Sequence, residues 1–223
     1  MDYLERNYDL VKERMIQQME NSIITGRKLI DTQLDMGLLN WFLRPVVKVF
    51  YDNWAKNDIR GNTMKQINLT LDAGIKLLKN GVNDDNFNRV VNENLSKYIE
   101  ADQTSLQCRK QHKNYRRIIE VAEKTFTNYL TEVVKLLEVS DEVKDYGDLC
   151  RVAFKSKEVA EENLMKQLDF TDRGIKIVEE DLSILKIPGF RKIIVKALRN
   201  GFEETKREFI NGLNDTYDQE KLK

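Results

Sequence analysis

The chain of 223 residues carries 37 basic and 37 acidic side chains, so it has no formal net charge. This balance gives no general electrostatic attraction to nucleic acid, and a nucleic-acid partner is not expected. Only two prolines and ten glycines occur, which predicts an all-α protein rather than a β-sandwich or barrel.

The cysteine content and the N-terminus predict a cytoplasmic protein. Cys108 and Cys150 are too few for the disulfide framework of a small secreted protein. The N-terminus is charged from its second residue and lacks an apolar signal core. The longest hydrophobic run, near residues 38–43, is far too short to span a bilayer.

The first helix is expected over residues 2–36, where apolar residues recur at steps of three and four. Gly37 and Asn40 mark a turn. A second helix follows through Trp54, with Pro45 in its first turn or at a kink.

A loop is expected over residues 57–63, and a third helix over residues 64–79. Gly81 then provides a stop signal, and Asn83 or Asp84 provides the cap of the next helix.

No proline or glycine occurs from Asp84 until Gly147. Residues 100–114 are mostly polar, and they either continue one helix over residues 84–138 or turn the chain back on itself. After them an apolar seam repeats in heptads, as in antiparallel bundles and coiled coils, at Tyr115, Ile119, Ala122, Phe126, Tyr129, Val133 and Leu136.

The last part of the chain predicts a turn over residues 139–148, a helix over 149–185 and a final helix over 190–214. The whole is interpreted as a single all-α domain over residues 1–223. It is expected to be an antiparallel helical bundle of about six helices, some of them long, with a subdivision near residues 100–114 as the alternative.

A short motif recurs around Gly26, Gly74 and Gly174, with Ala122 at the same place in a weaker match. A glycine inside a helix costs up to about 1 kcal/mol relative to alanine, so it usually marks a close helix crossing. The hypothesis is a duplicated helix-pair unit used about four times. The alternative is chance similarity among lysine-rich amphipathic helices.

The residues do not form a familiar catalytic or metal-binding pattern. His112 is the sole histidine, and Arg109 stands where a di-iron Glu-x-x-His pair would need its glutamate. A structural zinc site needs four Cys or His ligands, and the chain has three such residues. We therefore expect no cofactor and no enzymatic activity.

Cys108 lies one helical turn before His112, with Arg109 and Lys110 between them. Basic neighbours lower the pKa of a thiol, so a reactive or redox-sensing cysteine is the alternative to an inert one.

An aromatic stretch over residues 38–54 is interpreted mainly as core. Any exposed part of it is the best candidate for a protein-binding surface, because aromatic side chains dominate such sites. The candidate partner-binding residues are Trp41, Phe42, Tyr51 and Trp54.

Two basic clusters, at residues 109–117 and 186–199, contain no acidic side chain. Such clusters suit an anionic membrane surface, or else the solvated border of a core face. The candidate residues for an anionic surface are Arg109, Lys110, Lys113, Arg116, Arg117, Arg191, Lys192, Lys196 and Arg199.

The leading hypothesis is therefore a non-enzymatic interaction or scaffold protein that binds another protein through a helix face. The alternative is a peripheral membrane protein, a helical homodimer that uses the two basic clusters. In length and helix pattern alone, that alternative resembles the crescent-forming BAR-type helical dimers.

Overall fold

The computed structural model describes residues 2–32, 40–101, 113–140, 143–181 and 190–218. Within these ranges the secondary-structure elements are eight α-helices and one π-helical segment, which confirms the expected all-α fold. The elements are α1 (Asp2–Thr32), α2 (Asn40–Trp54), η2 (Ala55–Ile59), α3 (Arg60–Asn80), α4 (Asp84–Glu100), α5 (Tyr115–Leu137), α6 (Tyr146–Phe154), α7 (Lys157–Asp181) and α8 (Phe190–Asp218).

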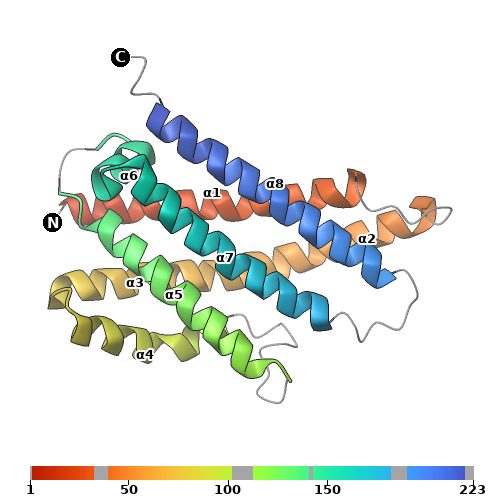
Figure 1. The fold of residues 1–223 in the computed structure, drawn as a ribbon, viewed down its shortest axis with the longest axis horizontal. Coiled ribbons are helices and arrows are strands. Elements are labelled where there is room, and N and C mark those ends of the chain that lie inside the picture. The colour runs from red at the N-terminus through yellow and green to blue at the C-terminus, as the bar shows by residue number, and fades with distance from the viewer. Residues whose placement is uncertain (1, 33–39, 102–112, 141–142, 182–189, 219–223) are drawn as a thin grey trace.

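Most neighbouring long helices pack in antiparallel directions, whereas α3 and α5 run in the same general direction (Figure 1). α1 and α3 run along the long axis of the molecule, while α5, α7 and α8 cross them obliquely. α3 contacts α1, α4 and α5, and α7 lies between α5 and α8. α2 lies beside the C-terminal end of α1 and is joined to α3 through η2. The fold is thus an all-α helical bundle in which most neighbouring helices are antiparallel.

The core is centred on the contact between α3 and α5. Leu71 and Leu77 of α3, and Phe126, Leu130 and Leu137 of α5, are completely buried. Burial of a leucine or phenylalanine side chain contributes about 1.5–3 kcal/mol relative to exposure. This pair of helices therefore provides the rigid frame on which the others pack.

The repeated glycines were expected to mark close helix crossings. That prediction is confirmed at Gly26, where a Cβ would collide with the Tyr51 hydroxyl, and at Gly74, where a Cβ would lie 3.0 Å from side-chain carbons of Val133 and Leu137. It is wrong at Gly174, where a Cβ would meet no atom of the described residues within 4 Å. The duplication of a helix-pair unit stays a prediction.

The stop and cap between α3 and α4 are confirmed. Gly81 has a φ of 90°, a conformation that favours glycine. The side-chain oxygen of Asn83 then accepts a hydrogen bond of 2.9 Å from the backbone N–H of Asn86. Such a cap satisfies one of the unpaired N–H groups at the start of a helix.

The chain turns back between α4 and α5. The rings of Tyr98 and Phe126 lie 4.8 Å apart between their centroids, so the two helices pack side by side. In one continuous helix these residues would be separated by about 40 Å, at about 1.5 Å per residue. The single helix over residues 84–138 is thereby excluded, although residues 102–112 themselves lie outside the described part of the chain.

The prediction of a loop over residues 57–63 is wrong, because η2 and the start of α3 occupy this segment. Ala55 is 2% exposed and packs with Met19 and Ile23 of α1. Arg60 forms two hydrogen bonds to the Glu20 carboxylate, at 2.6 and 2.7 Å. These contacts with α1 outweigh the weak local preference for a turn, because tertiary packing regularly overrides propensity.

The prediction of one unbroken helix over residues 149–185 is also wrong. Lys155 adopts a left-handed conformation with a φ of 57°, and it separates α6 from α7. Ser156 then accepts a hydrogen bond of 3.3 Å at its side-chain oxygen from the N–H of Val159, in the manner of a helix cap. The break allows the short helix α6 to bury both Leu149 and Phe154 in the core.

Candidate functional site

One candidate surface is the outward face of α2, which is held at its other face by α1. The Tyr51 hydroxyl donates a hydrogen bond of 2.9 Å to the carbonyl oxygen of Ile23. Burial raises the pKa of Tyr51, so the phenol stays protonated and able to donate at neutral pH. Two ion pairs also join the helices, Arg27–Asp52 at 3.1 Å and Lys48–Asp31.

Apolar side chains lie exposed on α2. Val46 is 42% exposed and Val49 is 61% exposed, and their spacing of three residues places them on one face, next to the exposed Pro45. The predicted partner-binding residue Tyr51 instead contacts α1. The side chains of the other three predicted residues, Trp41, Phe42 and Trp54, lie outside the described part of the structure.

The first basic cluster lies only partly within the described residues. Lys113, Arg116 and Arg117 are exposed near the start of α5. The guanidinium of Arg117 forms an ion pair of 2.6 Å with Glu180 of α7, and this contact lowers the pKa of that carboxyl group. Arg109 and Lys110 lie outside the described residues, as do the predicted reactive Cys108 and its neighbour His112.

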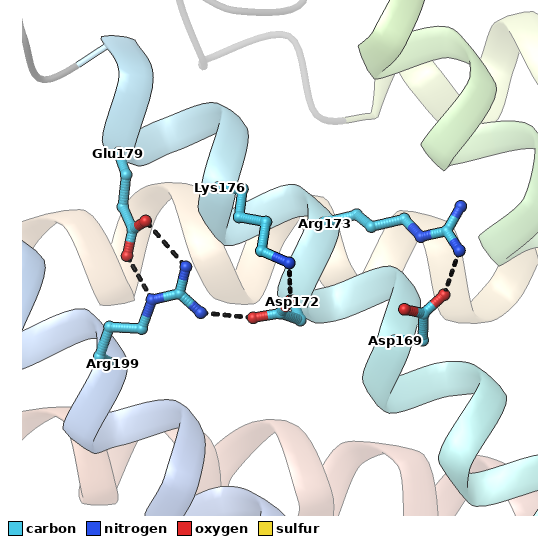
Figure 2. Close-up of polar contacts among 6 residues, drawn as sticks. All are labelled: Asp169, Asp172, Arg173, Lys176, Glu179 and Arg199. Atoms are coloured by element: carbon cyan, nitrogen blue, oxygen red, sulfur yellow. Dashed lines mark hydrogen bonds and ion pairs between the residues drawn. The ribbon is translucent and has the colours of Figure 1, made fainter.

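In the second basic cluster, Arg199 is bound by acidic side chains of α7 (Figure 2). Its guanidinium makes two hydrogen bonds to Glu179, at 2.5 and 2.8 Å, and a further one to Asp172. These hydrogen bonds raise the pKa of Arg199. Asp172 also pairs with Lys176 at 2.7 Å. Lys196 is exposed, whereas the side chains of Arg191 and Lys192 lie outside the description.

A second candidate site is a pocket of about 170 Å³ between α1, α5, α6, α7 and α8, here called the interhelical pocket. Apolar side chains form much of its wall, including Leu136, Phe154 and Phe209. The charged and polar groups that reach it include Arg14, Glu132, Tyr146, Cys150 and Gln167. A largely apolar hollow with a few converging polar groups is the usual form of a small-molecule site.

Glu132 has the most perturbed carboxyl group in this pocket. Burial raises its pKa to about 7, and the amide of Gln167 donates a hydrogen bond to its Oε2. No basic side chain within the described residues forms an ion pair with Glu132. A carboxyl group with a strongly raised pKa in a cleft marks a candidate functional site.

Arg14 brings a positive charge to the same pocket from α1. Its guanidinium lies 5.7 Å from the ring centroid of Tyr146 and donates one hydrogen bond, of 2.9 Å, to Gln17. Its Nε is buried and has no hydrogen-bond partner among the described residues. Burial raises the pKa of the Cys150 thiol to about 11, so this thiol is not an activated nucleophile at neutral pH.

The sequence interpretation did not find the interhelical pocket, because its charged residues are far apart in the chain. The only local signal is that Glu132 lies beside Tyr129 and Val133, two positions of the apolar seam on α5. A carboxylate at that place is either at the border of the core or directed into it. Only the packing of α1 and α7 against α5 decides which.

A wider hollow of about 720 Å³ lies between α1 and α3. Its charged side chains are exposed to solvent, which screens them from one another. They are Glu5, Asp9, Asp72, Lys76 and Lys79. The hollow therefore lacks the buried converging groups of the interhelical pocket.

Three comparisons with known proteins found no matching family model, no similar curated protein and no similar solved structure. Within the described residues, no group of three or more His, Cys, Asp or Glu side chains could hold a metal ion. None of the described helices combines the length and the apolar character needed to cross a membrane.

Proposed function

We propose that this chain is a non-enzymatic interaction protein that binds another protein through the outward face of α2. The observation that carries the proposal is the exposure of Val46 and Val49 side by side on a helix whose opposite face is fixed to α1. Single exposed valines are ordinary on protein surfaces, but adjacent ones on an anchored helix form a small preorganised apolar surface. Preorganisation favours binding, because little conformational entropy is then lost on association.

In this proposal Tyr51 has a supporting role. Its ring and hydroxyl lie against Gly26 and Ile23, so it holds α2 in place rather than contacting the partner. The ion pairs of Arg27 and Lys48 with α2 and α1 carboxylates add a second means of attachment. The contact with the partner is assigned to Val46 and Val49.

The membrane alternative draws less support from the same structure. Arg199 and Arg117 are paired with carboxylates of α7, so both would have to break ion pairs before they could bind an anionic surface. Lys113, Arg116 and Lys196 are exposed on the described surface. Each basic residue near a membrane contributes about 1 kcal/mol, so these three would contribute about 3 kcal/mol.

A site-specific photo-crosslinker tests the proposal in the full chain. In one variant benzoylphenylalanine replaces Val46, which is 42% exposed. In a second variant it replaces Val159 of α7, which is 41% exposed. After irradiation in the native cells, crosslinked products are separated and identified by mass spectrometry. We expect one dominant adduct from position 46 and none of comparable yield from position 159.

The crosslinked mass also identifies the partner, because an adduct of twice the chain mass would show a homodimer. Adding the substitution Val49→Glu to the variant that carries the crosslinker at position 46 should remove the dominant adduct. Equal products from both positions, or no adduct from position 46, would refute binding through the outward face of α2.

A further inference from the structure

The interhelical pocket is lined by an acidic and a basic side chain, neither of which forms an ion pair with another described residue. Glu132 on α5 accepts a hydrogen bond from Gln167, which is neutral. Arg14 on α1 donates to Gln17, also neutral, and its Nε has no hydrogen-bond partner in the part of the chain that the structure describes. No carboxylate among the described residues forms an ion pair with Arg14, and no basic group does so with Glu132.

The two charges face the same space but do not neutralise each other. Both act electrostatically on Tyr146 and Cys150, which lie on the same pocket wall. Removing a charged group from water without a partner is costly, so folding would favour a direct ion pair if the two groups could meet. Glu208 lines the pocket as well, but it is exposed to solvent.

The size of the pocket limits what could lie between these charges. The hollow of about 170 Å³ is close to the engineered cavity of about 150 Å³ that holds benzene. A second hollow of about 210 Å³ adjoins it and shares Gln18, Tyr129 and Phe209. Met15, Met19 and Ile67 line this second hollow, so it offers space for an apolar group.

We propose that the interhelical pocket binds a small zwitterion of the free amino acid class, with its carboxylate on Arg14 and its ammonium group on Glu132. The apolar side chain of the ligand would extend into the adjoining hollow. This binding site is independent of the protein-binding face on α2, which lies on a different surface.

The chemistry of each wall fits this assignment. A guanidinium presents several donors in one plane and therefore matches a carboxylate better than a lysine does. The carboxylate of Glu132 accepts hydrogen bonds from an ammonium group, while Gln167 fixes its orientation. A ligand that carries both charges would give each of the two residues a direct ion-pair partner at once.

Isothermal titration calorimetry on the full chain tests the proposal at about pH 8, where Glu132 is ionised. The probes are L-leucine, L-methionine and L-phenylalanine. Two further probes keep the shape of leucine but carry one charge each, namely 3-methylbutylamine and 4-methylpentanoate. We expect at least one amino acid to bind with a dissociation constant below about 1 mM, and both single-charge analogues of leucine to bind at least about tenfold more weakly than leucine.

Variants then assign the two charges. Glu132→Gln and Arg14→Gln should each weaken amino acid binding by at least about tenfold, whereas Glu120→Gln, an exposed change on the same helix as Glu132, should leave it unchanged. Because the analogue series uses the unaltered protein, the test stands even if a variant folds poorly. Absence of binding by all three amino acids, or equal binding of leucine and its amine, would overturn the proposal.

Discussion

The Tyr51 hydroxyl of α2 donates a hydrogen bond of 2.9 Å to the carbonyl oxygen of Ile23, beside Gly26 of α1. The carbonyl of Ile23 lies within a continuous helix, so the tyrosine adds a second hydrogen bond to a backbone oxygen. Space for the phenol exists because residue 26 has no side chain. The glycine and the tyrosine together therefore fix the position of α2 on α1.

This relationship predicts that Gly26→Ala destabilises the protein. The new methyl group would collide with the Tyr51 hydroxyl and displace the ring, with a loss of about 1–3 kcal/mol from overpacking and about 1 kcal/mol from the hydrogen bond. Gly174→Ala is the matched control, because its Cβ would meet no described atom within 4 Å. Both changes gain about 1 kcal/mol of helix propensity, so their comparison isolates the collision.

Urea denaturation of the two variants gives the free energies of unfolding. Gly174→Ala should equal or exceed the unaltered protein in stability, and Gly26→Ala should fall below the Gly174→Ala protein by at least about 1 kcal/mol. Equal stabilities of the two variants would mean that Tyr51 moves without cost and does not fix α2.

Asn7 links α1 to the end of α5. Its buried amide donates to the carbonyl oxygen of Val139 at 2.6 Å, and the same amide lies 3.3 Å from the carbonyl oxygen of Leu137. Carbonyl groups at a helix end have no partner in their own helix. Asn7→Ala should therefore cost about 1–3 kcal/mol, because buried acceptors lose their donor.

Chemical denaturation of Asn7→Ala measures this loss against Asn163→Ala. Asn163 also donates to a backbone carbonyl, that of Val159 at 3.0 Å, but the bond is exposed to water. The control should change the free energy of unfolding by no more than about 0.5 kcal/mol. Similar losses for the two variants would show that burial of Asn7 adds nothing to its hydrogen bonds.

Local signals in the sequence predicted the end of α3 and the start of α4 but not every break. Gly81 and Asn83 act through their own backbone and side-chain geometry, so they could be identified without knowledge of the fold. The left-handed Lys155 has no comparable signal, because lysine is not a residue that favours this conformation. Its left-handed backbone ends α6 directly after Phe154, which is buried in the core.

The same distinction applies to the charged residues. Arg199 belongs to a segment without acidic residues, so the sequence suggested an unpaired basic surface. Its partners Glu179 and Asp172 come from the preceding helix, and they meet Arg199 only because α7 and α8 pack antiparallel. The sequence did not predict the interhelical pocket for the same reason, because only packing brings Arg14 and Glu132 together.

Glu132 should give the protein an unusual pH dependence. Burial raises its pKa from 4.5 to about 7, so between these values the folded state binds more protons than the unfolded state. The free energy of unfolding contributed by this group therefore falls as the pH rises, by up to about 3 kcal/mol. Glu132→Gln stays neutral and should be more stable than the unaltered protein at about pH 8.

Urea denaturation at about pH 5 and about pH 8 tests this effect. The charged and titratable groups around Glu132 on the described helices are Arg14, Tyr129, Lys135, Tyr146, Cys150, Lys166 and Glu208. They are common to both proteins, so the difference between the proteins isolates Glu132. Glu120→Gln, an exposed change on the same helix, is the matched control. If the free energies of unfolding of Glu132→Gln and the unaltered protein differ by the same amount at both pH values, the carboxyl group titrates normally in the folded state.

Arg199 should stabilise the contact between α7 and α8. Arg199→Ala removes its hydrogen bonds to Glu179 and Asp172 and is expected to cost about 1 kcal/mol, a modest value because the guanidinium is 35% exposed and screened by solvent. Lys196→Ala, an exposed change one turn earlier on α8, should cost no more than about 0.5 kcal/mol.

The salt dependence of this difference identifies its origin. At about 1 M NaCl the Debye length is about 3 Å, so the loss caused by Arg199→Ala should shrink towards that of Lys196→Ala if ion pairing is responsible. A loss that persists at high salt would instead point to packing of the arginine stem against α7. In the first case Arg199 is engaged within the fold, and Lys196 is the better position for a charge reversal that probes anionic surfaces, because its substitution leaves the contact between α7 and α8 intact.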